Sequence, residues 1–124
     1  MNDLNISATQ STPSVSADFE RGILHMRGDS YPENSFELFG PVIRWVEEYL
    51  GSTDKPLRLE LELLYLNTSS VKAMMDILDL VEEAYRDKRD VSLRWVYDQQ
   101  NERVAELAEE FKEDCSFPFE ITSR

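Results

Sequence analysis

The segment from Leu57 to Leu66 constrains the fold more than any other part of this sequence. Leucines occupy every second position from Leu57 to Leu63, and charged residues stand between them. This alternation is typical of a β-strand with one buried and one solvent-facing side. From Leu64 to Leu66 both faces become apolar, which predicts that the carboxyl end of the strand enters the interior. Such a strand must bury its leucine face against another layer of the fold.

The remaining periodicities predict strands and helices in alternation. The expected elements are a hairpin with strands at 14–19 and 22–27, helices at 36–50, 71–85 and 102–115, and strands at 91–97 and 117–121. Helical crossovers between neighbouring strands are right-handed, so the later strands should be parallel and the opening hairpin antiparallel. The simplest architecture is an α/β fold, a mixed β-sheet with helices packed mainly on one face.

Several local features carry their own expectations. Residues 28–35 are predicted to form a loop that delivers Ser35 as the N-cap of the next helix. Pro41 should kink that helix or start it afresh, because proline cannot donate a backbone N–H. Residues 1–13 are expected to form either a flexible arm or a short edge strand. In the helix at 71–85, the buried stripe is predicted to comprise Val71, Met74, Met75, Leu78, Val81 and Tyr85.

Length and charge narrow the function classes. With 124 residues, a single domain spanning 1–124 is expected, and its 25 acids against 13 bases give a net charge of −12. Such a chain is repelled by phosphate backbones and anionic membrane surfaces, so we expect no nucleic-acid partner and no direct membrane insertion. The first residues do not resemble a signal peptide, and the longest apolar run is only 63–66. A soluble, cytoplasmic protein is therefore predicted.

Catalytic and metal-binding patterns are weak in this sequence. Cys115 and His25 are single, so neither an internal disulfide nor a Cys/His zinc site is expected. With four glycines, no dinucleotide fingerprint or phosphate-binding loop can be written. Asp76, Asp79 and Glu83 share one helix face and could hold Mg²⁺ in an enzyme, although a solvated face is the commoner meaning of such spacing. We expect no catalytic residues, metal or cofactor.

The junction after the central strand is more informative. Asn67, Thr68, Ser69 and Ser70 stand where a buried strand ends and a helix begins. One of these side chains suffices to cap the helix, and an exposed hydroxyl there could be phosphorylated without unfolding the domain. The residues alone do not distinguish among the three hydroxyls. Tyr31 lies in the polar loop predicted at residues 28–35, where an aromatic side chain favours a contact surface.

The sequence resembles the SiaC family of bacterial regulatory phosphoproteins. The motifs that carry the resemblance lie at 28–35 (GDSYPENS), 63–70 (LLYLNTSS), 72–79 (KAMMDILD), 93–95 (LRW), 101–111 (NERVAELAEEF) and 115–119 (CSFPF). The resemblance implies a STAS-like fold, similar to that of anti-sigma-factor antagonists. It implies a non-catalytic switch in which the unphosphorylated form binds and activates a membrane-associated diguanylate cyclase. A partner protein kinase and a metal-dependent phosphatase would act on the matching threonine, Thr68.

Under this hypothesis Thr68 lies at the centre of a partner-binding surface formed by Asn67, Ser69, Ser70 and Tyr31. Two other classes of function remain open. The chain could act as an anti-sigma-factor antagonist in a partner-switching system, which keeps the fold and changes the partner. It could also be an enzyme that uses the acidic residues Asp76, Asp79 and Glu83.

Overall fold

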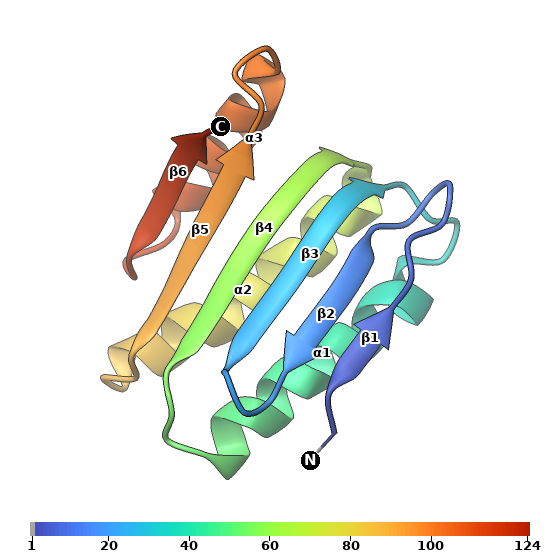
Figure 1. Cartoon of the computed structure of the whole chain (residues 1–124). Helices are drawn as coiled ribbons and strands as arrows, with labels where there is room; N and C mark the ends of the chain where they lie inside the picture. Colours follow the sequence, from blue (N-terminus) through green and yellow to red (C-terminus); the bar gives the residue numbers. More distant parts are fainter. Residues whose placement is uncertain (1) are drawn as a thin grey trace.

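The computed structural model describes residues 2–124, which form one six-stranded sheet and three helices (Figure 1). In chain order the elements are β1 (Leu4–Ile6), β2 (Ser14–Asp18), β3 (Ile23–Ser30), α1 (Ser35–Ser52), β4 (Leu57–Leu66), α2 (Thr68–Arg86), β5 (Val91–Tyr97), α3 (Glu102–Glu113) and β6 (Phe119–Ser123). The alternation of strands and helices confirms the α/β class predicted from the sequence.

The strands stand in the sheet in the order of the sequence, from β1 to β6. The hairpins β1–β2 and β2–β3 are antiparallel, whereas β3–β4, β4–β5 and β5–β6 are parallel. This is the mixed sheet that the crossover rule predicts. Of the two alternatives for the first residues, the edge strand is correct, because Leu4–Ile6 pair with Val15–Ala17.

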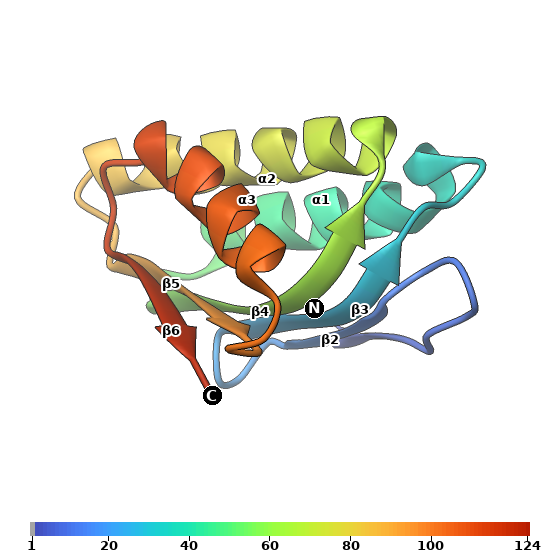
Figure 2. The ribbon, with the colours of Figure 1, turned by 90° about the horizontal axis from the view of Figure 1, so that it is seen from above.

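All three helices lie on the same side of the sheet, and the other side faces solvent (Figure 2). The alternating leucines of β4 form the middle of the core, where Leu57, Leu59, Leu61 and Leu63 are almost fully buried. Arg58, Glu60 and Glu62 lie between them on the open face, where Glu62 is hydrogen-bonded to His25 of β3. The domain therefore has two layers and one core.

The carboxyl end of β4 differs from the expectation. Leu64 and Tyr65 are both exposed, and neither side chain enters the interior. The β3–β4 register shifts here, since Gly28 pairs with Leu63 but Ser30 pairs with Leu66. A bulge adds one residue to a strand and breaks the two-residue alternation, so Leu63 and Leu66 both point into the core while the residues between them stay outside.

The region between β3 and α1 also differs in detail. Residues 28–30 continue β3, so the loop is shorter than predicted, and the N-cap of α1 is Asn34 with Ser35 as the first helical residue. Asparagine is at least as good an N-cap as serine, and its Oδ1 accepts hydrogen bonds from the N–H groups of Phe36 and Glu37. Pro41 lies within a single helix and does not start a new one.

Packing explains why α1 continues through Pro41. A proline inside a helix costs about 3 kcal/mol, yet α1 buries core residues on both sides of it. These are Leu38 and Phe39 before the proline, and Val42, Trp45, Val46 and Tyr49 after it. The burial of several large apolar side chains outweighs the loss of one backbone hydrogen bond.

Two members of the predicted α2 stripe are exposed. Met74, Leu78 and Val81 are buried as expected, but Met75 and Tyr85 face solvent. Met75 lies about 100° around the helix from Met74, outside the single stripe that meets the sheet. The remaining helix, α3, ends at Glu113, so Cys115 follows the helix and packs against the core from the loop before β6.

Candidate functional site

The parallel pairing of β3 and β4 brings two strand-to-helix junctions together at one end of the sheet. The backbone N–H of Asn67, after β4, donates to the carbonyl of Ser30 at the end of β3 over 2.9 Å. Only Asn67 separates β4 from α2, and the four-residue loop 31–34 separates β3 from α1. The first turns of both helices and the loop 31–34 therefore border one surface.

Asn67 organises this junction through three side-chain hydrogen bonds. Its Oδ1 accepts from the backbone N–H of Ser70 over 3.0 Å, which caps α2, and from the Ser69 hydroxyl over 3.2 Å. Its Nδ2 donates to the carbonyl of Pro32 over 3.3 Å. The N-cap of α2 thus also anchors the loop between β3 and α1, and the predicted capping role of this segment belongs to Asn67.

The three hydroxyls that follow Asn67 have different environments. Ser70 is fully buried and its hydroxyl shares a 2.8 Å hydrogen bond with the hydroxyl of Ser30. Ser69 is exposed, but its hydroxyl is hydrogen-bonded to that of Ser35 in the first turn of α1. Thr68 is exposed, and no group within residues 2–124 hydrogen-bonds to its hydroxyl.

These differences separate hydroxyls that are equivalent in the sequence. Transfer of a phosphoryl group to a hydroxyl requires the oxygen to be accessible and free to approach the donor. Ser70 does not meet the first condition, because it lies inside the domain. Ser69 would have to give up its hydrogen bond to Ser35, whereas Thr68 meets both conditions without any rearrangement.

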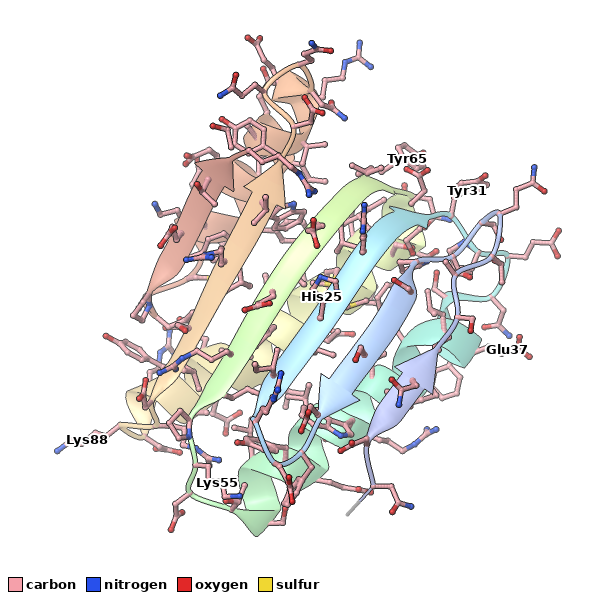
Figure 3. All side chains as sticks on the ribbon, viewed as in Figure 1. His25, Tyr31, Glu37, Lys55, Tyr65 and Lys88 are labelled. Carbon is pink, nitrogen blue, oxygen red and sulfur yellow. The ribbon has the colours of Figure 1, made fainter. Side chains whose placement is uncertain are left out.

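Tyr31 lies at the same end of the molecule, as predicted for a surface residue. Its hydroxyl donates to the carbonyl of Gln10 over 2.7 Å, and its backbone N–H donates to the carbonyl of Ser11. Its ring meets the ring of Tyr65 edge to face, with 6.1 Å between the centroids (Figure 3). The loop is thus tied to the segment between β1 and β2 on one side and to the bulge of β4 on the other.

The first turn of α2 suits an added negative charge. The first turn of α2 contains no acidic residue, and the helix N-terminus carries the positive end of the helix dipole. Lys72 stands four residues after Thr68 and is exposed on the same helix. A phosphate on Thr68 would therefore be compatible with the native helix.

The other chemical candidates are dispersed over the surface. Asp76, Asp79 and Glu83 are exposed side chains of α2, and residues 2–124 contain no group of three potential metal-ligating side chains. His25 is a half-buried strand residue whose Nε2 lies 2.7 Å from Glu62 Oε2 on the open face. That hydrogen bond lowers the pKa of Glu62. None of these residues lies at the junction.

Sequence reasoning missed several residues that shape the site. Ser30 and Ser35 supply the hydroxyls that engage Ser70 and Ser69, from positions more than thirty residues away in the chain. Tyr65 forms the second ring of the tyrosine pair. One signal for this site was present in the sequence, since a polar residue stands at the end of each of the two parallel strands. The carboxyl ends of parallel strands meet at one edge of the sheet, so these polar residues could be expected to lie together.

The comparisons with known proteins agree with this architecture. The family model described as "SiaC family regulatory phosphoprotein" matches residues 6–124. The chain is 68% identical to an uncharacterised protein of Pseudomonas aeruginosa (strain UCBPP-PA14), over 98% of this chain and 96% of that protein. It is also similar to the crystal structure of apo-SiaC from Pseudomonas aeruginosa, with a TM-score of 0.95 and 66% identity over 98% of this chain and 99% of the other.

A second similar structure shows a relative with its partner. It is the crystal structure of the diguanylate cyclase SiaD in complex with its activator SiaC from Pseudomonas aeruginosa. One chain in it matches with a TM-score of 0.97 and 66% identity, over 98% of this chain and all of that chain. Within residues 2–124, none of the helices is long and apolar enough to cross a membrane.

The family match covers almost the whole chain, and the fold of the solved relatives is the fold described above. The protein is accordingly regulatory and not itself catalytic. The resemblance seen in the sequence motifs is confirmed: the chain belongs to the SiaC family of regulatory phosphoproteins.

Proposed function

We propose that this protein, in its unphosphorylated form, binds and activates a diguanylate cyclase and so raises the level of cyclic di-GMP. Phosphorylation of Thr68 by a partner kinase ends the activation, and a metal-dependent phosphatase restores it. The observation that carries the proposal is the state of Thr68, the exposed hydroxyl of the junction that no group within residues 2–124 engages. The complex of the related SiaC with the cyclase SiaD supports the choice of partner.

The position of Thr68 explains how a phosphate could act as a switch without damaging the fold. Thr68 is the first residue of α2, where added negative charge interacts favourably with the helix dipole. A phosphate adds a charge of about −1.5 to −2 and considerable bulk at this surface. The domain would remain folded, and the change would be felt by a partner that lies over Thr68.

The loss of binding follows from desolvation of the phosphate. A partner that covers Thr68 would have to remove water from a dianion, which costs free energy unless cationic groups replace that water. We expect phosphorylation to weaken the complex at least about tenfold, which corresponds to about 1.4 kcal/mol. Asn67 and Ser69 flank Thr68 in the chain, and Tyr31 packs against Tyr65 at the same end of the sheet, so these three are the expected contact residues. Ser70 is buried and supports the surface from inside.

The test compares three variants in calorimetric titrations against the cyclase SiaD of Pseudomonas aeruginosa, with cyclic di-GMP synthesis as the second measurement. Thr68→Ala should bind and activate as the unmodified protein does and should not respond to the kinase. Thr68→Asp should bind more weakly. Ser69→Ala is the matched control for the modified residue: it should still be phosphorylated at Thr68, and phosphorylation should still weaken its binding.

Peptide mapping of the kinase-treated protein completes the experiment. Phosphate on a residue other than Thr68 would contradict the proposed site. Equal affinity of the phosphorylated and unphosphorylated proteins for the cyclase would contradict the switch. Failure of the unmodified protein to bind the cyclase would contradict the proposed partner.

A further inference from the structure

Exposed apolar side chains gather at the end of the sheet where Thr68 lies. Six large apolar residues within the described part of the chain are exposed, and four of them lie in the loop, strand end and helix start that form this junction: Tyr31, Phe36, Leu64 and Tyr65. Tyr65 is 55% exposed and Phe36 is 76% exposed. Apolar side chains gathered at one end of a small domain mark an interaction surface more often than chance exposure.

The β-bulge in β4 is what places two of these residues outside. It leaves Leu64 and Tyr65 between the buried residues Leu63 and Leu66, so neither of them enters the core. The ring of Tyr31 then packs against Tyr65 and is fixed at its other end by the hydrogen bond to Gln10. We call Tyr31, Leu64 and Tyr65 the apolar platform, and Thr68 follows it by three residues.

Phe36 stands on the α1 side of the same junction. Its neighbour Ser35 shares a hydrogen bond with Ser69, which places the first turns of α1 and α2 side by side. Thr68 immediately precedes Ser69, so it lies in the chain between the platform and the α1 contact. Phe36, which is exposed, therefore belongs to the same junction as Thr68.

A hollow of about 650 Å³ adjoins the platform. Its lining includes Tyr31 and Pro32 of the loop, Ser11 and Thr12 of the β1–β2 connection, and the carboxylate side chains Glu33 and Glu37. Figure 3 shows Glu37 at the same end of the molecule as Tyr31 and Tyr65. No basic side chain lines this hollow. It is therefore suited to the cationic end of a lysine or arginine side chain.

We propose that the apolar platform and this hollow together bind one amphipathic segment of the diguanylate cyclase, in which apolar side chains are followed by a lysine or arginine. The inference rests on the proposed function and specifies its interface. The apolar side chains cover Tyr31, Leu64 and Tyr65, and the cation enters the hollow between Glu33 and Glu37. Charge complementarity with this acidic protein favours such a segment over an acidic one.

This arrangement also gives the phosphate of Thr68 a specific effect. The carboxylates that attract the partner's cation lie in the loop and in α1, whereas Thr68 follows the apolar platform. A phosphate there meets the apolar part of the segment, where it finds no cation and loses water. The acidic character of the hollow and inhibition by phosphorylation are thus compatible.

The test uses the full chain and the cyclase SiaD of Pseudomonas aeruginosa in calorimetric titrations at low and high salt. Tyr65→Ala should weaken binding at least about tenfold, as expected for an aromatic residue at the centre of an interface. Tyr85→Ala is the matched control, because Tyr85 is also exposed but lies in the last turn of α2. It should bind within about twofold of the unaltered protein, which is the range of an uninvolved surface residue.

Charge reversal tests the hollow separately. Glu37→Lys should weaken binding at least about tenfold and should reduce its dependence on salt, because an attractive ion pair is replaced by repulsion. Glu47→Lys changes the net charge of the protein equally from an exposed position on the same helix that does not line the hollow, and it should bind nearly normally. Circular dichroism confirms that all four variants are folded.

The outcomes separate the two proposals. If the unaltered protein binds SiaD and phosphorylation weakens binding, but Tyr65→Ala and Glu37→Lys bind normally, the docking surface is wrong and the proposed function stands. If the unaltered protein does not bind SiaD, the proposed function itself is wrong. If sedimentation shows that the protein alone forms a dimer that Tyr65→Ala dissociates, the platform binds a second copy of the chain and the inference is overturned.

Discussion

Replacement of Asn67 tests whether one side chain holds the whole junction together. Asn67→Ala removes the cap of α2 and the hydrogen bond from Nδ2 to Pro32. Loss of an asparagine N-cap costs about 1 kcal/mol, and loss of a further hydrogen bond costs about 0.5–1.5 kcal/mol. The free energy of unfolding should therefore fall by roughly 2 kcal/mol.

Asn67→Asp divides this effect into its two parts. Aspartate keeps an oxygen that can cap α2 but has no N–H to donate to Pro32. The Asn67→Asp variant should lose only the contribution of the hydrogen bond to Pro32, about 1 kcal/mol of the free energy of unfolding. Urea denaturation followed by circular dichroism gives both values, since a domain of this size is expected to unfold in a single transition.

Two results would refute this reasoning. If the free energy of unfolding of Asn67→Ala fell by less than about 0.5 kcal/mol, Asn67 would contribute no more to stability than an ordinary surface residue. Equal losses in the two variants would mean that the cap contributes nothing and that the bond to Pro32 carries the whole effect. Hydrogen exchange at the Ser70 amide gives a local control, because this N–H should exchange faster in the alanine variant than in the aspartate variant.

Three further predictions concern titration and modification. The pKa of Glu82 is lowered chiefly by the hydrogen bond that its carboxylate accepts from the Ser116 N–H. The ionised carboxylate therefore stabilises the folded protein at pH values above the pKa that Glu82 has in the unfolded chain. This stabilisation is lost as the pH falls through the pKa of Glu82 in the folded protein. Glu82→Gln should thus flatten the fall in stability below about pH 4.5, and an unchanged slope in acid denaturation would contradict this. Burial raises the pKa of the Cys115 thiol to about 11. Iodoacetamide at pH 8 should therefore label Cys115 much more slowly in the native protein than in the urea-unfolded protein. Equal labelling rates would show that the thiol is not buried in the native protein. Phosphorylation of Thr68 should raise the free energy of unfolding by about 0.3–1 kcal/mol through the helix dipole, and a lower melting temperature in calorimetry would show that it disturbs α2.

The sheet was predictable because its pattern is dictated by one-sided burial. Alternating leucines in β4 have a single low-energy arrangement, with apolar residues toward the helices and charged residues toward water. The right-handed crossover rule then determines the parallel pairing. These local and topological rules act along the whole chain, so the mixed pairing and the one-sided helical layer followed from them.

The errors occur where tertiary contacts decide between similar local options. Asn34 and Ser35 are both good caps, and the position of the chain after β3 selects the first. The bulge at Leu64 leaves no mark on the composition of β4, because an exposed leucine and a buried one look alike in sequence. The same holds for the three hydroxyls after Asn67, since their different environments depend on partners that lie more than thirty residues earlier.

The two-layer architecture also determines how the protein tolerates substitution along β4. From Leu57 to Leu63, polar replacements should be rejected at every second position and accepted between, because only one face of the strand is covered. The bulge shifts this rhythm by one residue, so two adjacent tolerant positions, Leu64 and Tyr65, precede the intolerant Leu66. Because Leu64 and Tyr65 lie outside the core, both positions can vary during evolution without a change in the fold.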